Sequence, residues 1–250
     1  VRHLPFSSKA LGAWGAYYSP AVTGLNNNDL ASTWSDLSGG GNNLTSSGTI
    51  RPTYNTNVIA GFPAFQFGIS ASTRFTVATS VTTNAATCFT VWNKISNNGL
   101  ARCRYSRVSL IWNTANTTST GDYNNSNAII FQAPSDQTVT PYNVNVTRLN
   151  TNANVSYTMG AWVSTWSRIN GTAVNTNVNG AAASFTTSAT SLNSNEFRIG
   201  CGSYTASPTS DLNGYISAAI LFKTAVSNSL AFRIQRALSM TFKIAQTGSA

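Results

Sequence analysis

Short apolar runs, separated by clusters of Asn, Gly, Ser and Pro, recur along the whole chain. In several of these runs apolar and polar residues alternate, which places successive side chains on opposite faces of a β-strand. The runs occupy residues 64–67, 87–92, 108–112, 128–131, 143–146, 162–166, 197–200 and 215–222. Many short strands with turn residues between them predict an all-β sandwich or barrel.

The clearest helical pattern lies near the end of the chain. Ser227 is a suitable N-cap residue. After it, Leu230, Ile234 and Leu238 recur at the spacing of one helical face. The pattern predicts an amphipathic helix over about 227–240, and we expect it to pack across the edge of the sandwich.

The chain shows no internal repeat and no linker that would divide it. We therefore expect one domain over residues 12–250, preceded by an arm over residues 1–11. Two interpretations of the arm stay open: it drapes over a neighbouring subunit on assembly, or it is a frayed terminus. The residues expected to make contacts in an assembly are Arg2, His3, Leu4 and Phe6.

Three stretches together carry a family resemblance. Residues 34–45, WSDLSGGGNNLT, resemble the W-x-D-x-S-G-x-G-N-x-x pattern near the start of concanavalin A-like, laminin-G-like jelly-roll domains. As in that family, they are followed by residues 51–54 and 59–67. Residues 212–222 and the helix after them resemble the closing strand and terminal helix of the family, and residues 174–180 stand where its Asn-Gly hairpin lies.

The resemblance implies two antiparallel sheets packed face to face, a jelly-roll sandwich with one C-terminal helix. Such domains occur in extracellular glycan-binding modules and, in Asn/Thr/Gly-rich versions, in virion proteins of tailed phages. Low charge and the lack of a recognisable signal peptide make this sequence similar to the phage group. The analogy places the fold and leaves the function to be argued separately.

From this analogy we expect a non-enzymatic virion structural protein, either a capsid decoration or a component of a fibre or appendage. It would be made in the host cytoplasm, act on the particle, and have other virion proteins and further copies of itself as partners. The alternative is a lectin-like module that binds glycans on the host surface.

The charge balance narrows the range of partners. Only 8% of the residues are charged, and the formal net charge is +9, so neutral amides and hydroxyls must cover the surface. The basic residues are scattered, and the tightest group, Arg102, Arg104 and Arg107, contains one aromatic residue, Tyr105, rather than a series of basic residues interleaved with stacking aromatics. We therefore expect no nucleic-acid partner. No run of eighteen apolar residues occurs, so we expect no membrane span.

The three cysteines, Cys88, Cys103 and Cys201, are widely spaced. Zinc sites use short-spaced pairs and often histidine, so this spacing does not indicate one. We expect buried thiols, with one long-range disulfide and a remaining thiol as the alternative.

Candidate catalytic groups are scarce. The chain has six acids, with Glu196 as its one glutamate and His3 as its one histidine. Glycosidases on related jelly rolls need two carboxylates that flank the scissile bond, and no strand carries such a pair. A hydrolase acting through Glu196 stays a minor alternative, and we expect no enzymatic activity.

The loop containing Asp36, Asn42 and Asn43 has two interpretations. Asp, Ser and Asn side chains bond to nearby backbone groups, which predicts a structural turn with Trp34 packed beneath it. The alternative is a sugar-binding or calcium loop. Calcium needs six to eight oxygens and usually several carboxylates, so the sequence allows the cation without supporting it.

Trp162 and Trp166 are candidates for stacking on a sugar ring. Their even spacing on a strand places them on the same face, so both should lie inside or both outside. A tryptophan on a strand usually packs in the core. The alternative is an exposed aromatic platform for glycans.

Overall fold

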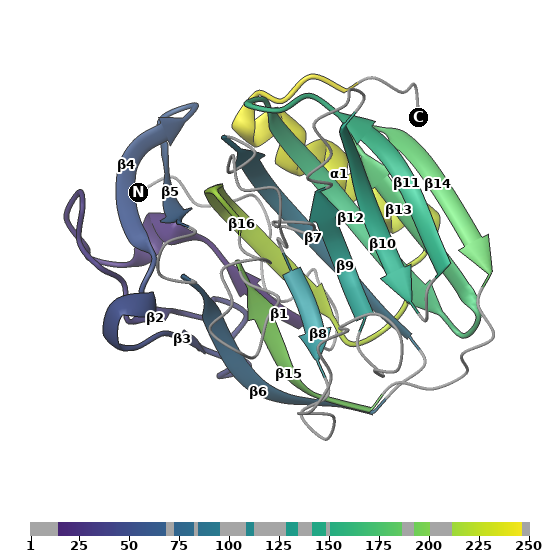
Figure 1. Ribbon diagram of the computed structural model, residues 1–250, viewed down its shortest axis with the longest axis horizontal. Helices are drawn as coiled ribbons and strands as arrows, with labels where there is room; N and C mark the ends of the chain where they lie inside the picture. The colour runs from purple at the N-terminus through teal and green to yellow at the C-terminus, as the bar shows by residue number, and fades with distance from the viewer. Residues whose placement is uncertain are drawn as a thin grey trace, which may run out of the picture.

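A computed structural model of the chain describes residues 15–68, 73–82, 85–95, 109–112, 129–134, 142–148, 151–186, 193–200 and 212–246. Within them, two antiparallel sheets face each other in a sandwich, and one helix lies outside it (Figure 1). The sandwich and the terminal helix expected from the sequence are confirmed. Each of the eight apolar runs overlaps a strand of the structure.

The first sheet forms the face on which the helix packs. In spatial order its strands are β14 (Ala181–Thr186), β13 (Ala173–Val178), β12 (Trp162–Asn170), β7 (Ala85–Lys94), β16 (Gly214–Phe222), β5 (Phe62–Phe67) and β4 (Thr53–Ile59), and β1 (Gly15–Tyr18) also pairs with β16. The hairpin expected around residues 174–180 is β13 and β14, joined at Asn179 and Gly180.

The second sheet lies opposite. Its strands, in spatial order, are β11 (Thr151–Tyr157), β10 (Tyr142–Arg148), β9 (Ile129–Pro134), β8 (Ser109–Trp112), β15 (Asn193–Ile199), β6 (Phe75–Thr82), β3 (Leu44–Thr45) and β2 (Thr33–Trp34). Short 3-10 turns lie at η2 (Pro20–Val22) and η3 (Gly48–Ile50).

Strand β7 shows how the core is divided. Cys88 and Trp92 point into the core between the two sheets, whereas Phe89 and Val91 point to the opposite face. A central strand buried on both faces reads as a continuous apolar run rather than as an alternation. The first sheet therefore needs a second cover on its outer side.

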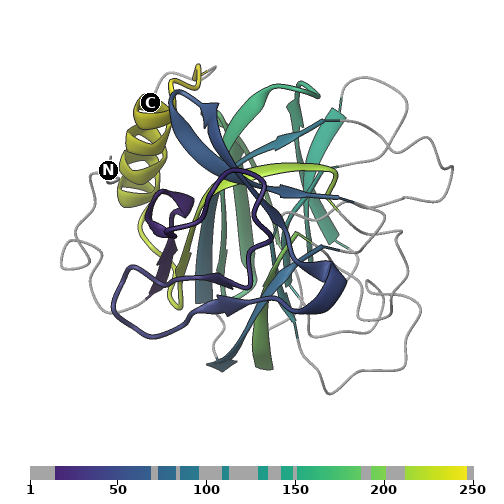
Figure 2. The ribbon, with the colours of Figure 1, turned by 90° about the vertical axis from the view of Figure 1, so that its left-hand side faces the viewer.

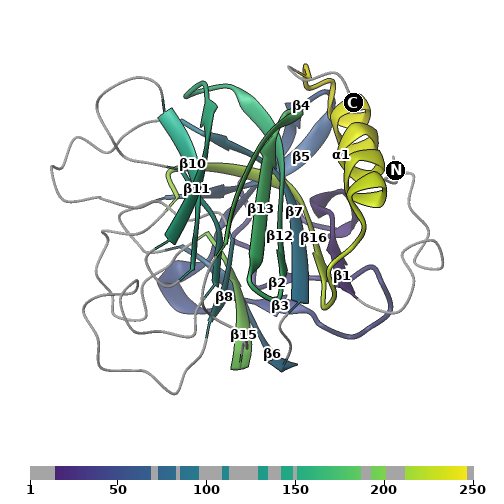
Figure 3. The ribbon, with the colours of Figure 1, turned by 90° about the vertical axis from the view of Figure 1, so that its right-hand side faces the viewer.

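That cover is helix α1 (Asn228–Phe242), which lies along the outer face of the first sheet (Figures 2 and 3). Its buried face includes Ile234, Leu238 and Phe242, and these side chains belong to the same apolar cluster as Phe89 and Val91 of β7. The expectation that the helix would cross the edge of the sandwich is therefore wrong, because the central strands present apolar residues on their outer side as well.

The first and last residues of the helix lie within two residues of the predicted limits. Ser227 caps it, because its Oγ accepts a hydrogen bond from the Leu230 amide at 3.3 Å. Lys243 follows in the left-handed conformation, with φ of 55°. No helix in the described part of the chain is long and apolar enough to cross a membrane.

Candidate functional site

The Asp36 carboxylate is enclosed by hydrogen-bond donors. Its Oδ1 accepts from the backbone amides of Tyr17 at 3.0 Å and Ser38 at 2.9 Å. Its Oδ2 accepts from the Asn42 backbone amide at 3.0 Å and the Asn42 side-chain amide at 3.1 Å. Burial alone would raise the pKa of Asp36, but the hydrogen bonds from Ser38, Tyr17 and Asn42 outweigh it and hold this pKa below its usual value.

Neighbouring contacts join the same loop to β1. Asn43 Oδ1 accepts from the Asp36 amide at 2.8 Å, and the Tyr18 hydroxyl donates to the Asn42 carbonyl at 2.6 Å. Burial, together with the negative charge of Asp36, raises the pKa of Tyr18, so the hydroxyl remains a donor. Trp34 is fully buried beside this loop.

These contacts match the structural-turn interpretation of the loop. Both Asp36 oxygens face N–H groups, whereas a calcium ion needs carboxylate lone pairs directed at itself. Within the described residues no group of three or more His, Cys, Asp or Glu side chains gathers at one place. Asp36, Asn42 and Asn43 therefore hold the β2–β3 connection against β1.

Trp162 and Trp166 share the outer face of β12, as their spacing predicts, but their environments differ. Trp166 is only 2% exposed and lies under α1, with its ring 5.8 Å from the Phe232 ring in an edge-on contact. It has no open face on which a sugar could stack, so its assignment to an exposed platform is wrong. Trp162 is only partly buried, and its ring stacks on Tyr215 at 6.2 Å and 27°.

Trp162 and Tyr215 come together through Asn93, a residue that the sequence did not single out. Asn93 of β7 is the register partner of both Trp162 on β12 and Tyr215 on β16. The row continues to Gln66 of β5, the next partner of Tyr215. We call Trp162, Asn93, Tyr215 and Gln66 the aromatic platform.

Asn93 contributes a buried acceptor to this platform. Its Nδ2 donates to the Gly160 carbonyl at 2.7 Å, which fixes the orientation of the amide. Its Oδ1 is buried and has no hydrogen-bond partner. A buried acceptor without a donor is costly, so a ligand hydroxyl or a water that reached it would be held.

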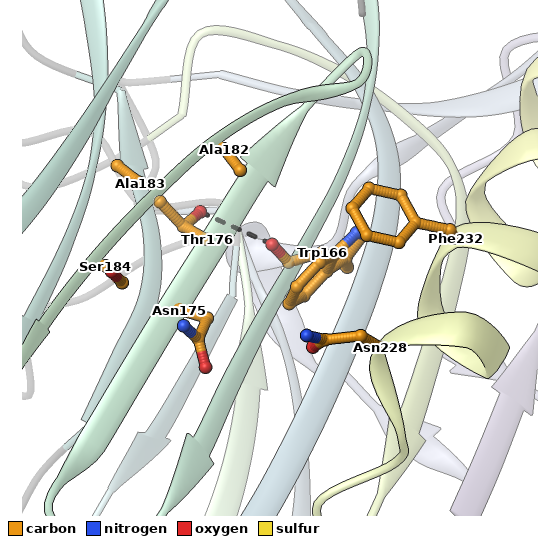
Figure 4. Close-up of a pocket in the computed structure, with 8 residues that line it drawn as sticks. All are labelled: Trp166, Asn175, Thr176, Ala182, Ala183, Ser184, Asn228 and Phe232. Atoms are coloured by element: carbon orange, nitrogen blue, oxygen red, sulfur yellow. Dashed lines mark hydrogen bonds between the residues drawn. The ribbon is translucent and has the colours of Figure 1, made fainter. Parts of the chain in front are cut away.

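A separate pocket of about 160 Å³ opens where the first turns of α1 meet β13 and β14, and we call it the α1 pocket. Figure 4 shows the Trp166 indole beside the Phe232 ring, with Asn228 reaching from α1 toward the strands that carry Asn175 and Ser184. The remaining lining residues are Thr176, Ala182 and Ala183. None of the lining residues is charged.

A guanidinium lies directly behind this pocket. Arg168 of β12 donates from NH2 to Asn175 Oδ1 and from NH1 to the Val226 carbonyl, both at 2.8 Å. Its guanidinium carbon is 5.9 Å from the centre of the Trp166 ring. Burial lowers the pKa of Arg168 from its usual value, but an arginine pKa starts so high that the side chain stays charged at neutral pH.

Several candidate residues lie wholly or partly outside the described part of the chain. The arm residues Arg2, His3, Leu4 and Phe6 and the basic group at Arg102, Arg104 and Arg107 lie outside it, as do Cys103 and Cys201. The backbone of Glu196 pairs with Ala78 and Trp112, and its side chain is not described. Cys88 is buried in the core between the sheets.

Comparison with known proteins supports the fold. No protein-family model and no curated protein matches the chain. Among solved structures, a Trypanosoma rangeli sialidase in complex with sialic acid matches with a TM-score of 0.55 and 12% identity, over 90% of this chain and 33% of the sialidase. The chain thus spans about a third of that enzyme.

Two further matches are more similar in size to the chain. Domain 4 of an extracellular arabinanase from Geobacillus stearothermophilus, in complex with arabinotriose, has a TM-score of 0.50 and 12% identity, over 92% of this chain and 97% of that domain. The receptor-binding domain of botulinum neurotoxin type G has a TM-score of 0.53 and 14% identity, over 88% of this chain and 50% of that one. The chain therefore has the fold of the concanavalin A-like, lectin-like β-sandwich domains.

Proposed function

We propose that this chain is a non-catalytic carbohydrate-binding module and that the aromatic platform contacts the sugar. This is the lectin-like alternative of the sequence analysis. The observation that carries it is the buried, unpartnered Asn93 Oδ1 between the partly exposed rings of Trp162 and Tyr215.

The chemistry of the platform suits a sugar ring. One face of a pyranose presents C–H groups, which pack on aromatic rings, and its rim presents hydroxyls, which donate to and accept from amides. Trp162 and Tyr215 supply the apolar surface. Asn93 and Gln66 supply amide groups in the same row of the sheet.

The surroundings favour a neutral contact surface. The four platform residues carry no charge, in a chain with only 8% charged residues, so binding would depend on stacking and hydrogen bonds more than on ionic attraction. A domain of the same fold and nearly the same length was solved with arabinotriose. That match supports only the compatibility of this fold with a bound sugar.

A glycan panel followed by calorimetry tests the proposal. We expect binding to at least one polysaccharide, and Trp162→Ala should weaken it about tenfold or more, since truncating an aromatic hot-spot residue costs about 2 kcal/mol or more and tenfold corresponds to about 1.4 kcal/mol. Met240→Ala is the control, because Met240 is 66% exposed on α1 and lies outside the platform. Absence of binding across the panel, or equal affinities for Trp162→Ala and the unaltered chain, would overturn the proposal.

The virion role and the self-assembly expected from the family resemblance remain predictions. The arm that would make such contacts lies outside the described residues. Light scattering of the purified chain tests assembly: a dimer or trimer is expected, and a monomer at all concentrations would contradict it.

A further inference from the structure

We infer that the α1 pocket binds a carboxylate group, so that the glycan recognised by this chain carries an acidic sugar. The inference rests on the proposed function for the sugar and on the pocket itself for the acid. The pocket is well short of the roughly 300–1,000 Å³ of sites that enclose a drug-sized ligand, and its 160 Å³ suits an end group.

Two side chains that line the pocket, Trp166 and Asn175, carry N–H donors. Trp166 lines it, is 2% exposed, and its indole Nε1 is buried with no hydrogen-bond partner. Asn175 has its Oδ1 occupied by Arg168, which leaves its Nδ2 as the group to offer a ligand. An indole nitrogen and an amide nitrogen donate hydrogen bonds and do not accept them, so a ligand group with acceptor oxygens complements these two side chains.

The positive charge around the pocket favours an anionic acceptor group over a neutral one. The Arg168 guanidinium lies behind the lining residue Asn175, to which it is hydrogen-bonded, and its bond to the Val226 carbonyl holds this positive charge in place. Asn228 begins α1, so the pocket also faces the positive end of a 15-residue helix. No lining residue is acidic, and no acid occurs in α1. A carboxylate meets both requirements, since it is an anion with two acceptor oxygens.

The pocket and the aromatic platform lie on the same face of the sheet. Trp162 and Trp166 are four residues apart on β12, a spacing of about 13 Å at about 3.3 Å per residue. Ser164, between them on this face, is fully buried beneath α1, where Gln235 Nε2 donates to its carbonyl at 2.8 Å. We therefore infer that one glycan chain passes around the helix, with an acidic sugar in the α1 pocket and a neutral ring on the aromatic platform.

The indole N–H signal of Trp166 in a ¹H–¹⁵N spectrum reports directly on the pocket, and Trp166→Phe identifies it. We expect glucuronate to shift this signal in a saturable way and glucose to leave it unchanged. Acetate should act more weakly than glucuronate. Equal shifts with glucuronate and glucose, or no shift with glucuronate, would overturn the inference. Equal affinity for acetate and glucuronate would overturn the assignment to an acidic sugar.

Two variants test the charge argument. Ser184→Asp places a negative charge at the rim of the pocket, on an exposed residue of β14, and should weaken glucuronate binding at least tenfold. Thr172→Asp makes the same charge change in the exposed turn between β12 and β13 and should leave affinity within twofold. Arg168→Gln should weaken binding at least tenfold as well, and Arg51→Gln, in a loop elsewhere, is its control. The inference would be overturned if Ser184→Asp bound glucuronate as tightly as Thr172→Asp. It would also be overturned if Arg168→Gln bound glucuronate as tightly as Arg51→Gln.

The outcomes separate this inference from the proposed function. If a polysaccharide binds through Trp162 while glucuronate leaves the Trp166 signal unchanged, the proposed function is supported and the inference about the α1 pocket is refuted. If glucuronate shifts the Trp166 signal while no polysaccharide binds, the α1 pocket is supported and the proposed function is refuted.

Discussion

Replacing Asp36 by asparagine tests the structural role of its loop. The new amide would keep one acceptor oxygen for the Tyr17 and Ser38 amides, which now bond to Oδ1. Its NH2 group would face the Asn42 backbone and side-chain amides, which now donate to Oδ2 at 3.0 and 3.1 Å. Two hydrogen bonds to a charged acceptor would become two donor–donor contacts.

The expected cost follows from these contacts. Hydrogen bonds to a charged group contribute about 1.5–3 kcal/mol each. Asp36 is only partly buried, so water replaces part of what is lost, and we expect a loss of about 2–3 kcal/mol in the free energy of unfolding. For a chain of this size that corresponds to a fall in Tm of about 4–12 °C.

Urea unfolding at pH 7 measures the effect, with Asp29→Asn as the control. Asp29 also sits in a turn, where its carboxylate accepts a hydrogen bond from the Asn26 amide at 2.7 Å, and its loss should cost about 1 kcal/mol or less. Equal stability of Asp36→Asn and the unaltered chain would refute the structural role. So would a rise in the unfolding midpoint with calcium that Asp36→Asn abolishes, since a ligand that binds only the folded state stabilises it.

The pH dependence has a definite sign. The pKa of Asp36 is lower in the folded chain than the value of about 3.9 in an unfolded one. Its contribution is therefore complete above about pH 4 and is lost as the pH falls through the folded-state pKa. The difference in stability between Asp36→Asn and the unaltered chain should shrink below about pH 4, and an unchanged difference there would contradict this account.

Three further changes probe the packing, each measured by urea unfolding. Gly200→Ala should cost about 3 kcal/mol or more, because φ is +94° and the added Cβ would collide with the Phe67 ring; a loss under about 1 kcal/mol would contradict it. Thr165→Val should cost about 1–3 kcal/mol, because Trp92 Nε1 donates to Thr165 Oγ1 at 3.0 Å in the core. Ser227→Ala removes the α1 cap and should cost about 1 kcal/mol.

The strands could be predicted where burial leaves a pattern in the sequence. The runs around Phe89 and Ile220 are apolar on both faces, and both lie on central strands of the first sheet. Strands such as β6 (FTVATSVT) and β14 (AAASFT) contain mainly small or polar residues. Cross-strand hydrogen bonds define these strands, and such pairing leaves little trace in composition.

The sequence predicts the limits of α1 from Ser227 and from the apolar stripe that begins at Leu230. The position of the helix depends instead on which faces of the sheets need cover. A strand such as residues 215–222, apolar at consecutive positions, needs cover on both faces. The second sheet covers one face, and α1 covers the other.

The candidate site was predictable only in part. Even spacing correctly placed Trp162 and Trp166 on one face of a strand. Which of them α1 covers depends on tertiary packing. Asn93 and Tyr215 lie 69 and 53 residues from Trp162 in sequence, and only strand register brings them beside it, so no local pattern could have identified them.

A crystal structure of the chain with its tightest-binding oligosaccharide would show where the sugar lies. We expect a sugar ring packed on Trp162 and Tyr215, with a hydroxyl donating to Asn93 Oδ1. A sugar bound at the Asp36 loop or on the second sheet, with the aromatic platform empty, would contradict this expectation.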